Sequence, residues 1–186
     1  MTSPTPLQRT PNLILGPFYP VSPPLDAGNE LWNAGRAIRP GHRCVELRGR
    51  VIDLNGDAVC DALVEAWQAD DLGRYRHPSA PRPQPDDAAF SGYAVQRTDS
   101  WGCYCFRTLV PGAYAADGAR RAPHIHFQVT GAVDRLVTQM FFPREPLNAD
   151  DHWLRSVRRP EQLVAGVVLD TPDALHLRWD IVLTSG

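Results

Sequence analysis

The sequence predicts an all-β protein, a single-domain β-sandwich with long loops and an extended N-terminal segment. Eighteen prolines and fourteen glycines interrupt the chain, and no long stretch shows the 3.6-residue hydrophobic period of an amphipathic helix. Short β-branched or alternating segments lie between turn sequences instead. Short strands separated by regular turns are typical of sandwiches and barrels.

Seven segments have the composition of strands. They are residues 44–53, 63–68, 102–108, 124–130, 136–142, 162–169 and 174–183. Turn sequences separate several of them, among them Asn-Gly at 55–56, Pro-Gly at 111–112 and Asp-Gly at 117–118. One short helix is expected within residues 148–159.

The length of 186 residues suits one compact domain. We expect residues 41–186 to form this domain. Residues 1–40 are rich in proline and glycine and are expected to wrap the surface or contact an oligomer partner. Residues 78–90 form a second proline-rich stretch, and loops of that length in compact domains are often functional.

Charge and hydropathy exclude several classes of partner. The formal net charge is -2 and the basic residues are scattered, so no nucleic-acid partner is expected. No apolar run approaches membrane-spanning length, and the N-terminus does not resemble a signal peptide, so we expect a cytoplasmic protein without membrane contact. The four cysteines are expected to be free thiols that pack in the fold.

The most informative segment is residues 122–127, which contains His124, Ile125 and His126. In an extended strand, residues i and i+2 point to the same face, so both imidazoles would lie on one side. Neutral imidazole is the commonest protein metal ligand. A His-x-His pair is therefore either half of a metal site or an ordinary surface or core pair.

Further ligands must come from other segments. No nearby acidic residue completes a two-His, one-carboxylate triad. Tyr114 follows the Pro-Gly turn, and Tyr75 lies in a glycine-containing segment further upstream. Two phenolates with two imidazoles suit ferric iron, and tyrosine is a known iron ligand. For either tyrosine taken alone, a packed or hydrogen-bonded phenol is the better interpretation.

Taken together, these motifs resemble the intradiol ring-cleaving dioxygenases, especially the iron-bearing β chain of protocatechuate 3,4-dioxygenase and the catalytic domain of catechol 1,2-dioxygenases. The resemblance extends from about residue 16 to residue 183. It rests on segments in the family's order, at residues 16–19, 47–51, 63–68, 73–75, 97–99, 106–108, 111–114, 124–126 and 138–142.

The resemblance implies one non-haem ferric ion per chain, with Tyr75, Tyr114, His124 and His126 as its ligands. Tyr114 would be the equatorial tyrosinate and Tyr75 the axial one, which leaves the metal and takes up a substrate proton. The implied substrates are a small aromatic diol and dioxygen. The ring would be cleaved between its two hydroxylated carbons to a cis,cis-muconate-type product, with protocatechuate or a related substituted catechol as substrate.

The resemblance also implies roles around the metal. Arg121 would be the catalytic arginine that stabilises negative charge on the substrate, whereas Arg120 would face solvent. Gln139, Tyr19 and Trp67 would contact the substrate, and for Trp67 a core role is an equal alternative. The chain would be a homo-oligomer or part of a hetero-oligomer.

The sequence departs from the family in three places. The interval between Tyr114 and His124 is shorter than in the protocatechuate enzymes, and Ala115 and Ala116 stand where a bulkier pocket wall is expected. The order Ala122-Pro123 before His124 differs from the family's usual Pro-Ala and is more similar to that of the non-catalytic α chain. An N-terminal helical region like that of the standard catechol or hydroxyquinol enzymes is not expected.

Three other readings fit parts of the sequence. The segment 49–66 also occurs in non-enzymatic β-sandwich modules. A structural subunit that pairs with a separate catalytic chain is a second alternative. A zinc hydrolase using His124 and His126 is the third, although no further ligand with a general base stands at a suitable spacing.

Overall fold

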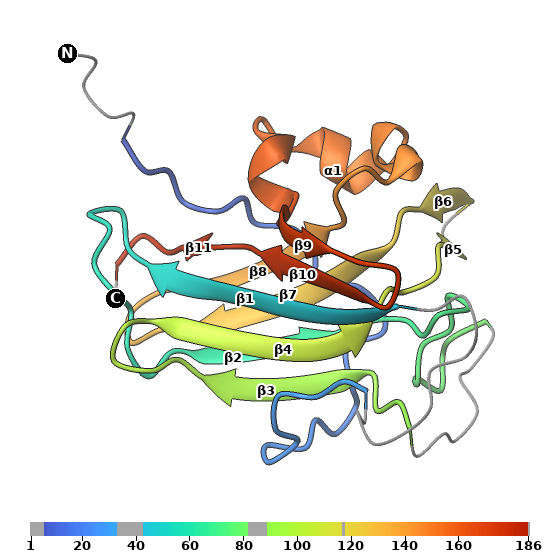
Figure 1. Cartoon of the computed structure of the whole chain (residues 1–186), viewed down its shortest axis with the longest axis horizontal. Helices are drawn as coiled ribbons and strands as arrows, with labels where there is room; N and C mark the ends of the chain where they lie inside the picture. Colours follow the sequence, from blue (N-terminus) through green and yellow to red (C-terminus); the bar gives the residue numbers. More distant parts are fainter. Residues whose placement is uncertain (1–5, 33–42, 82–88, 117, 186) are drawn as a thin grey trace.

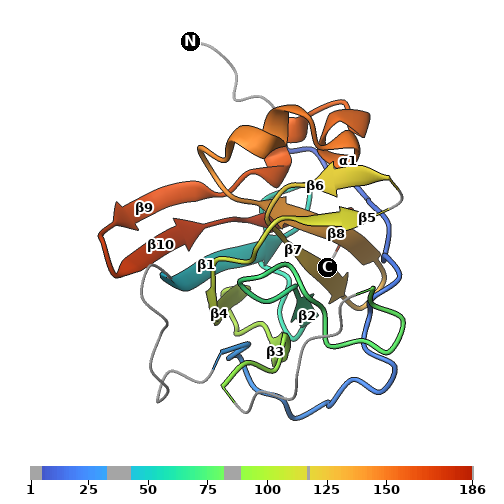
Figure 2. The ribbon, with the colours of Figure 1, turned by 90° about the vertical axis from the view of Figure 1, so that its right-hand side faces the viewer.

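The computed structural model describes residues 6–32, 43–81, 89–116 and 118–185. Two β-sheets pack face to face (Figures 1 and 2). One sheet comprises β1 (Cys44–Ile52), β4 (Cys103–Leu109), β9 (Gly166–Asp170), β10 (Ala174–Arg178) and β11 (Ile181–Val182). The other comprises β2 (Leu63–Trp67), β3 (Tyr93–Arg97), β7 (His124–Thr130) and β8 (Arg135–Phe141), in the order β3-β2-β7-β8. The expected all-β sandwich is therefore confirmed.

Three smaller elements flank the sandwich. β5 (Tyr114–Ala116) pairs with β6 (Ala119–Arg121) in a short hairpin. The helix α1 (His152–Ser156) lies within the region where a short helix was expected, between the 3-10 turns η1 (Pro146–Ala149) and η2 (Pro160–Leu163). No helix in the described part of the chain is long and apolar enough to cross a membrane.

The core fills the space between the two sheets. In β1, Val45, Leu47 and Val51 are fully buried, because alternate side chains of a strand face one side of its sheet. The rings of Phe106 and Phe127 meet across the sheets with centroids 5.9 Å apart. Burying one such apolar side chain contributes about 1.5–3 kcal/mol to folding.

Strand β7 is buried on both faces, and this arrangement creates the candidate site. Ile125 and Phe127 belong to the core between the sheets. His124 and His126 alternate with them and therefore lie on the opposite face of the sheet, yet both are 2% exposed. The loops and the N-terminal segment must therefore cover this outer face of β7.

Most strand predictions are confirmed. The strand expected at 124–130 has these bounds in the structure. Four more strands differ from their expected bounds by one residue at one or both ends, namely those expected at 44–53, 63–68, 102–108 and 136–142. Strands β3, β5 and β6 were not predicted from the sequence. The Asp-Gly turn expected between β5 and β6 includes residue 117, which lies outside the described residues, whereas Gly118 has a positive φ of 77°.

Two strand predictions were wrong in part. The segment 162–169 becomes a strand only at Gly166, because Pro160 begins a 3-10 turn and the Trp179 Nε1–H donates to the carbonyl of Gln162. The segment 174–183 is interrupted between β10 and β11. There the Asp180 carboxylate accepts a hydrogen bond from the Arg50 N–H at 3.0 Å, in place of a backbone carbonyl.

The described part of the N-terminal segment lies on the sandwich. The Thr10 N–H donates to the Val182 carbonyl at 2.9 Å and the Leu13 N–H to the Val137 carbonyl at 2.7 Å. Leu31 is fully buried. The predicted boundary between residues 40 and 41 lies outside the described residues, as do residues 82–88 of the predicted loop at 78–90.

Candidate metal and substrate site

The two histidines of β7 supply one side of the candidate site. The Nδ1 atom of His124 lies 2.6 Å from the carbonyl oxygen of Ala122. Because a carbonyl oxygen only accepts, Nδ1 is the donor and Nε2 keeps its lone pair. The Nε2 atoms of His124 and His126 are 3.1 Å apart. Both imidazoles thus present the nitrogen that a metal would bind at one point.

The ring of His126 is held by packing. It stacks on the indole of Trp67, with centroids 5.0 Å apart and planes inclined by 12°. Trp67 is its direct neighbour across the β2–β7 ladder. Gly16 also packs against it, since a Cβ atom at Gly16 would lie 3.1 Å from Cε1 of His126. The N-terminal segment therefore forms part of the wall of the site.

Tyr75 lies in a loop and Tyr114 begins β5, and Gly73 allows the two segments to pack closely. In the turn before Tyr75, the Asp70 carboxylate accepts hydrogen bonds from the Leu72 and Arg74 N–H groups. Gly73, at φ 74°, lies so close to the segment before Tyr114 that a Cβ atom would be 2.4 Å from the Ala113 carbonyl oxygen. A side chain at Gly73 would therefore separate the two tyrosine loops.

Four donor atoms converge where these elements meet. The Oη atom of Tyr114 lies 3.4 Å from Oη of Tyr75 and 3.3 Å from Nε2 of His124. Two ligands bound at about 2.1 Å lie about 3.0 Å apart at a right angle and about 3.6 Å apart at 120°. The observed separations, 3.1–3.4 Å, fall within this interval. These three separations are compatible with the binding of one metal ion by the four residues expected as ligands.

The environment favours the forms of the histidines that bind metal. Burial, with the nearby charge of Arg121, lowers the pKa of His124 to about 3. Burial and the neighbouring His124 hold the pKa of His126 well below its usual value. Both imidazoles are therefore neutral at physiological pH.

The phenols need a cation to ionise. Burial, and next the adjacent Tyr114, raise the pKa of Tyr75 well above the ordinary value. A bound metal ion reverses this preference, because coordination favours the deprotonated ligand. Within the described ranges no three His, Cys, Asp or Glu side chains gather where a metal could sit, so the donor set depends on the two phenols.

The predicted arginine points inward. Arg121 is 3% exposed, whereas the neighbouring Arg120 is exposed, as predicted. The Nε–H of Arg121 donates to Asp151 at 2.9 Å and its Nη2 to Oε1 of Gln139 at 2.6 Å. Gln139 is fully buried and lies opposite His126 in the β7–β8 ladder.

A cleft of about 340 Å³ borders both tyrosines of the candidate site. Its walls are small or apolar side chains, among them Phe18, Leu72, Ala80, Ala113 and Ala115. A second cleft, of about 310 Å³, is lined by Trp67, Tyr75 and Phe18. Among the described residues of the first cleft no side chain carries a formal charge, so its wall favours an aromatic ring.

Phe18 borders both clefts, whereas Tyr19, predicted to contact substrate, is not among the residues that line them. The Tyr19 hydroxyl donates to Glu65 at 2.6 Å, and its ring packs edge-on against Trp67 at 5.0 Å. Tyr19 therefore packs against Trp67 in this structure, and a contact between Tyr19 and substrate stays a prediction.

No role was predicted for Asp151, nor for Gly16 and Phe18, although both lie in the segment 16–19 that resembles the family. Phe18 stacks on the ring of Tyr75 at 4.7 Å. The available signals were an aromatic residue directly after Gly16-Pro17, and for Asp151 an acidic residue before a short helix, which is the pattern of an N-cap. Neither pattern says which distant residue it will contact.

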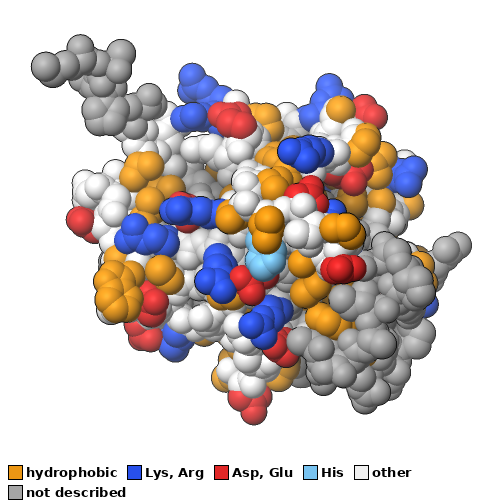
Figure 3. Space-filling model, in the orientation of Figure 1, with side chains coloured by type: hydrophobic (Ala, Val, Ile, Leu, Met, Phe, Trp, Pro, Cys, Tyr) orange, Lys and Arg blue, Asp and Glu red, His pale blue; other side chains and the backbone are white. Residues whose placement is uncertain are grey.

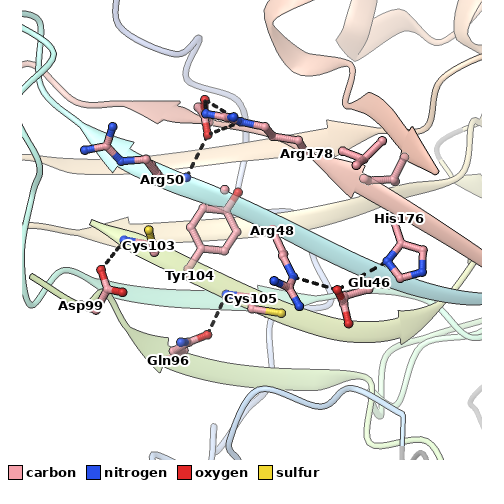
Figure 4. A pocket seen from close by; sticks show the side chains of 14 residues that line it. Glu46, Arg48, Arg50, Gln96, Asp99, Cys103, Tyr104, Cys105, His176 and Arg178 are labelled. Atoms are coloured by element: carbon pink, nitrogen blue, oxygen red, sulfur yellow. Dashed lines mark hydrogen bonds and ion pairs between the residues drawn. The ribbon is translucent and has the colours of Figure 1, made fainter. Parts of the chain in front are cut away.

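A separate cleft, of about 690 Å³, lies on the outer face of the sheet formed by β4, β1 and β10 (Figure 4). None of the four donors lines it. Its charged side chains pair with one another, as Arg48 does with Glu46 at 2.7 Å and Arg178 with Asp180 at 2.9 Å. On this face of the molecule charges of both signs are interspersed (Figure 3). We therefore place the candidate site at the four donors.

Known proteins match the chain over most of its length. The dioxygenase family model matches residues 14–185. The protocatechuate 3,4-dioxygenase beta chain of Burkholderia cepacia is 40% identical over 161 residues, which cover 81% of this chain and 68% of that protein. Catechol 1,2-dioxygenase 2 of Acinetobacter lwoffii is 32% identical over 157 residues, covering 76% of this chain and 54% of that protein.

A solved structure shares the fold. The dioxygenase domain of a dioxygenase carbohydrate-binding protein fusion from Streptomyces sp. SirexAA-E superposes with a TM-score of 0.73 at 26% identity. The match covers 96% of this chain and all of that one.

The β-sandwich fold and the family match together define the chain as a dioxygenase. The chain belongs to the intradiol ring-cleaving dioxygenase family. It is accordingly an oxidoreductase, and the family to which it belongs uses non-haem iron.

Proposed function

We propose that this chain binds one ferric ion through Tyr75, Tyr114, His124 and His126 and cleaves a catechol between its two hydroxylated carbons with dioxygen. The observation that carries the proposal is the convergence of two phenol oxygens and two imidazole nitrogens, with separations of 3.1–3.4 Å, on the covered face of β7. Ferric iron bound there supplies a Lewis acid and a template for the two substrate oxygens.

The protein's own residues would hold the substrate and handle its protons. Tyr75 borders both clefts, so its phenolate oxygen is placed to receive a proton from an entering catechol hydroxyl. The stack of Trp67 on His126 fixes the position of that imidazole. The covering of β7 by loops excludes bulk water, which strengthens electrostatic interactions in the site.

Arg121 would stabilise negative charge. Its guanidinium is buried, and its positive charge favours the deprotonated form of Tyr75. A group with this charge in a water-excluded site also favours the catecholate over the neutral diol. Gln139, held by Arg121, would contact the substrate from the same side.

For the substrate we propose protocatechuate or a related substituted catechol. The 40% identity to a protocatechuate 3,4-dioxygenase beta chain supports this choice. The small walls at Ala113 and Ala115 leave room for a ring substituent. Because that relative is named as one chain of an enzyme, we propose that this chain forms oligomers, either with itself or with a second kind of chain.

Three further assignments are part of the proposal. Residues 41–186 would be the catalytic domain, and residues 1–40 would be an extended segment that completes it. The protein would act in the cytoplasm.

A panel of catechols tests the function. Iron-loaded protein is mixed with protocatechuate, catechol, 4-methylcatechol and hydroxyquinol, while oxygen uptake and product absorbance are followed. Uptake of one O₂ per ring cleaved, with a muconate-type product, is expected for at least one compound. Arg121→Ala should retain iron and turn over slowly, which ties uptake to the site. Iron-loaded protein that consumes no oxygen with any of the four would refute the proposal.

A further inference from the structure

Asp151 connects the helix α1 to the candidate site. It is fully buried and precedes α1 as its N-cap residue. Its Oδ1 atom accepts hydrogen bonds from the Trp153 and Leu154 N–H groups, both at 3.1 Å. One carboxylate oxygen is thus sufficient to cap the helix.

The second oxygen of the same carboxylate faces the site. Oδ2 accepts the Nε–H of Arg121 and the backbone N–H of Ala122, both at 2.9 Å. Ala122 is the residue whose carbonyl oxygen accepts from Nδ1 of His124. Asp151 therefore holds both the arginine and the backbone of Ala122, the residue whose carbonyl orients the first histidine.

The contact continues to Gln139. Arg121 donates from Nη2 to Oε1 of Gln139, and this donor fixes which end of the amide is the oxygen. The Nε2 of Gln139 is buried and has no hydrogen-bond partner among the described residues. Since buried polar groups are nearly always hydrogen-bonded, the two amide hydrogens are available to an oxygen atom of a bound molecule.

Burial makes the position of this arginine depend on its partner. The side chains of Arg121 and Asp151 are 4% and 0% exposed. A guanidinium that loses a buried carboxylate partner must move toward other acceptors or toward water, because an unpaired buried charge is strongly unfavourable. Such a movement would also release the amide of Gln139.

We propose that Asp151 is a positioning residue for ring cleavage, which fixes the Arg121 guanidinium and, through it, the amide of Gln139. The inference rests on the proposed function, because it assigns Asp151 a role in turnover by way of Arg121. Asp151 touches neither the four donor atoms nor the clefts in the described structure, so its effect is indirect.

Asparagine at this position separates the two tasks of the carboxylate. In Asp151→Asn the side-chain oxygen can still cap α1, since asparagine is as good an N-cap as aspartate. The amide NH₂ would then face the Arg121 and Ala122 donors and cannot accept from either. Asp151→Ser is a second variant that caps the helix and is too short to reach the arginine.

A matched control is Asp134→Asn. Like Asp151, Asp134 accepts from an arginine: Arg9 donates two hydrogen bonds to its carboxylate, both at 3.0 Å. Asp134 follows the C-terminal end of β7, whereas the two histidines lie at the N-terminal end of that strand. It should change stability without changing turnover.

The experiment measures kcat, KM, iron content and visible absorption of the iron-loaded variants. Asp151→Asn should lower kcat by about 10- to 100-fold, the usual range for residues that orient groups of a metal site. Iron content and the visible band should stay unchanged. In the Arg121→Ala background, Asp151→Asn should change kcat by less than about threefold, because residues that act as one unit are not additive.

Several results would overturn the inference. They are a kcat within about threefold of wild type for Asp151→Asn, an undiminished effect in the Arg121→Ala background, and loss of iron or of folding in both Asp151 variants. Wild-type protein that turns over no catechol would instead refute the proposed function, and this inference with it. An active wild type beside an equally active Asp151→Asn variant refutes only the role of Asp151.

Discussion

Replacing Gly16 with alanine brings a methyl group against the imidazole of His126. Gly16 has a φ of 78°, a conformation that costs an alanine about 1–2 kcal/mol. The new Cβ atom would lie 3.1 Å from Cε1 of His126, so the ring must shift by a few tenths of an ångström. Because Trp67 stacks on that ring at 5.0 Å, we expect about 1–3 kcal/mol more from overpacking.

Gly28 provides the control for this experiment. Its φ is 69°, but a Cβ atom there would meet nothing within 4 Å. Gly28→Ala should therefore show the backbone cost alone and lower Tm by about 3–6 °C, whereas Gly16→Ala should lower it by about 6–15 °C.

The assays are thermal unfolding of both variants and the visible spectrum of the iron-loaded proteins. Only Gly16→Ala should shift the visible band, because only that substitution displaces a proposed ligand. Equal losses of Tm, or an unchanged band in Gly16→Ala, would show that the N-terminal segment does not set the position of His126.

Four further substitutions, one of them a control, test the other proposed roles. Tyr114→Phe should remove or strongly shift the visible band, because it deletes a phenolate donor, whereas the control Cys103→Ser should leave the band unchanged. If the two variants have the same visible spectrum, Tyr114 is not a ligand. Arg121→Ala should keep its iron and lose about 10²- to 10³-fold in kcat, the range for a lost charge-stabilising donor; normal turnover would reject that role. Asp134→Asn should cost about 1 kcal/mol at pH 7, because the Arg9 guanidinium holds the pKa of Asp134 well below its usual range. Because the pKa of Asp134 is lowered in the folded state, its carboxylate stabilises the folded protein above the unfolded pKa of about 3.9, and this stabilisation is lost as the pH falls below that value. The difference in Tm between wild type and Asp134→Asn should therefore be constant from about pH 7 to pH 5 and become smaller below about pH 4. A difference that grows in acid would contradict this.

The sequence predicted the parts of the site that depend on local patterns. The period-2 geometry of a strand placed His124 and His126 on one face, and the structure has β7 at the predicted bounds. The inward direction of Arg121 and outward direction of Arg120 follow from the same alternation. The tyrosines were chosen by resemblance to a family, because spacing alone does not bring Tyr75 close to a strand 49 residues further along the chain.

The parts that could not be predicted are long-range. Asp151 is a recognisable N-cap in sequence, but its contact with Arg121 joins residues 30 positions apart. The strand expected over 174–183 is interrupted at Asp180, where a side-chain oxygen, and not a backbone carbonyl, accepts the Arg50 N–H of β1. Local propensity contains no information on such partners, which depend on how the sheets pack.

Metal content and visible absorption of the purified wild-type chain test the central claim most directly. We expect about one iron per chain and a red to purple tyrosinate-to-ferric band, since two phenols and two imidazoles are the donors. Colourless protein that contains zinc, or iron bound without any visible band, would contradict the assignment of Tyr75 and Tyr114 as ligands.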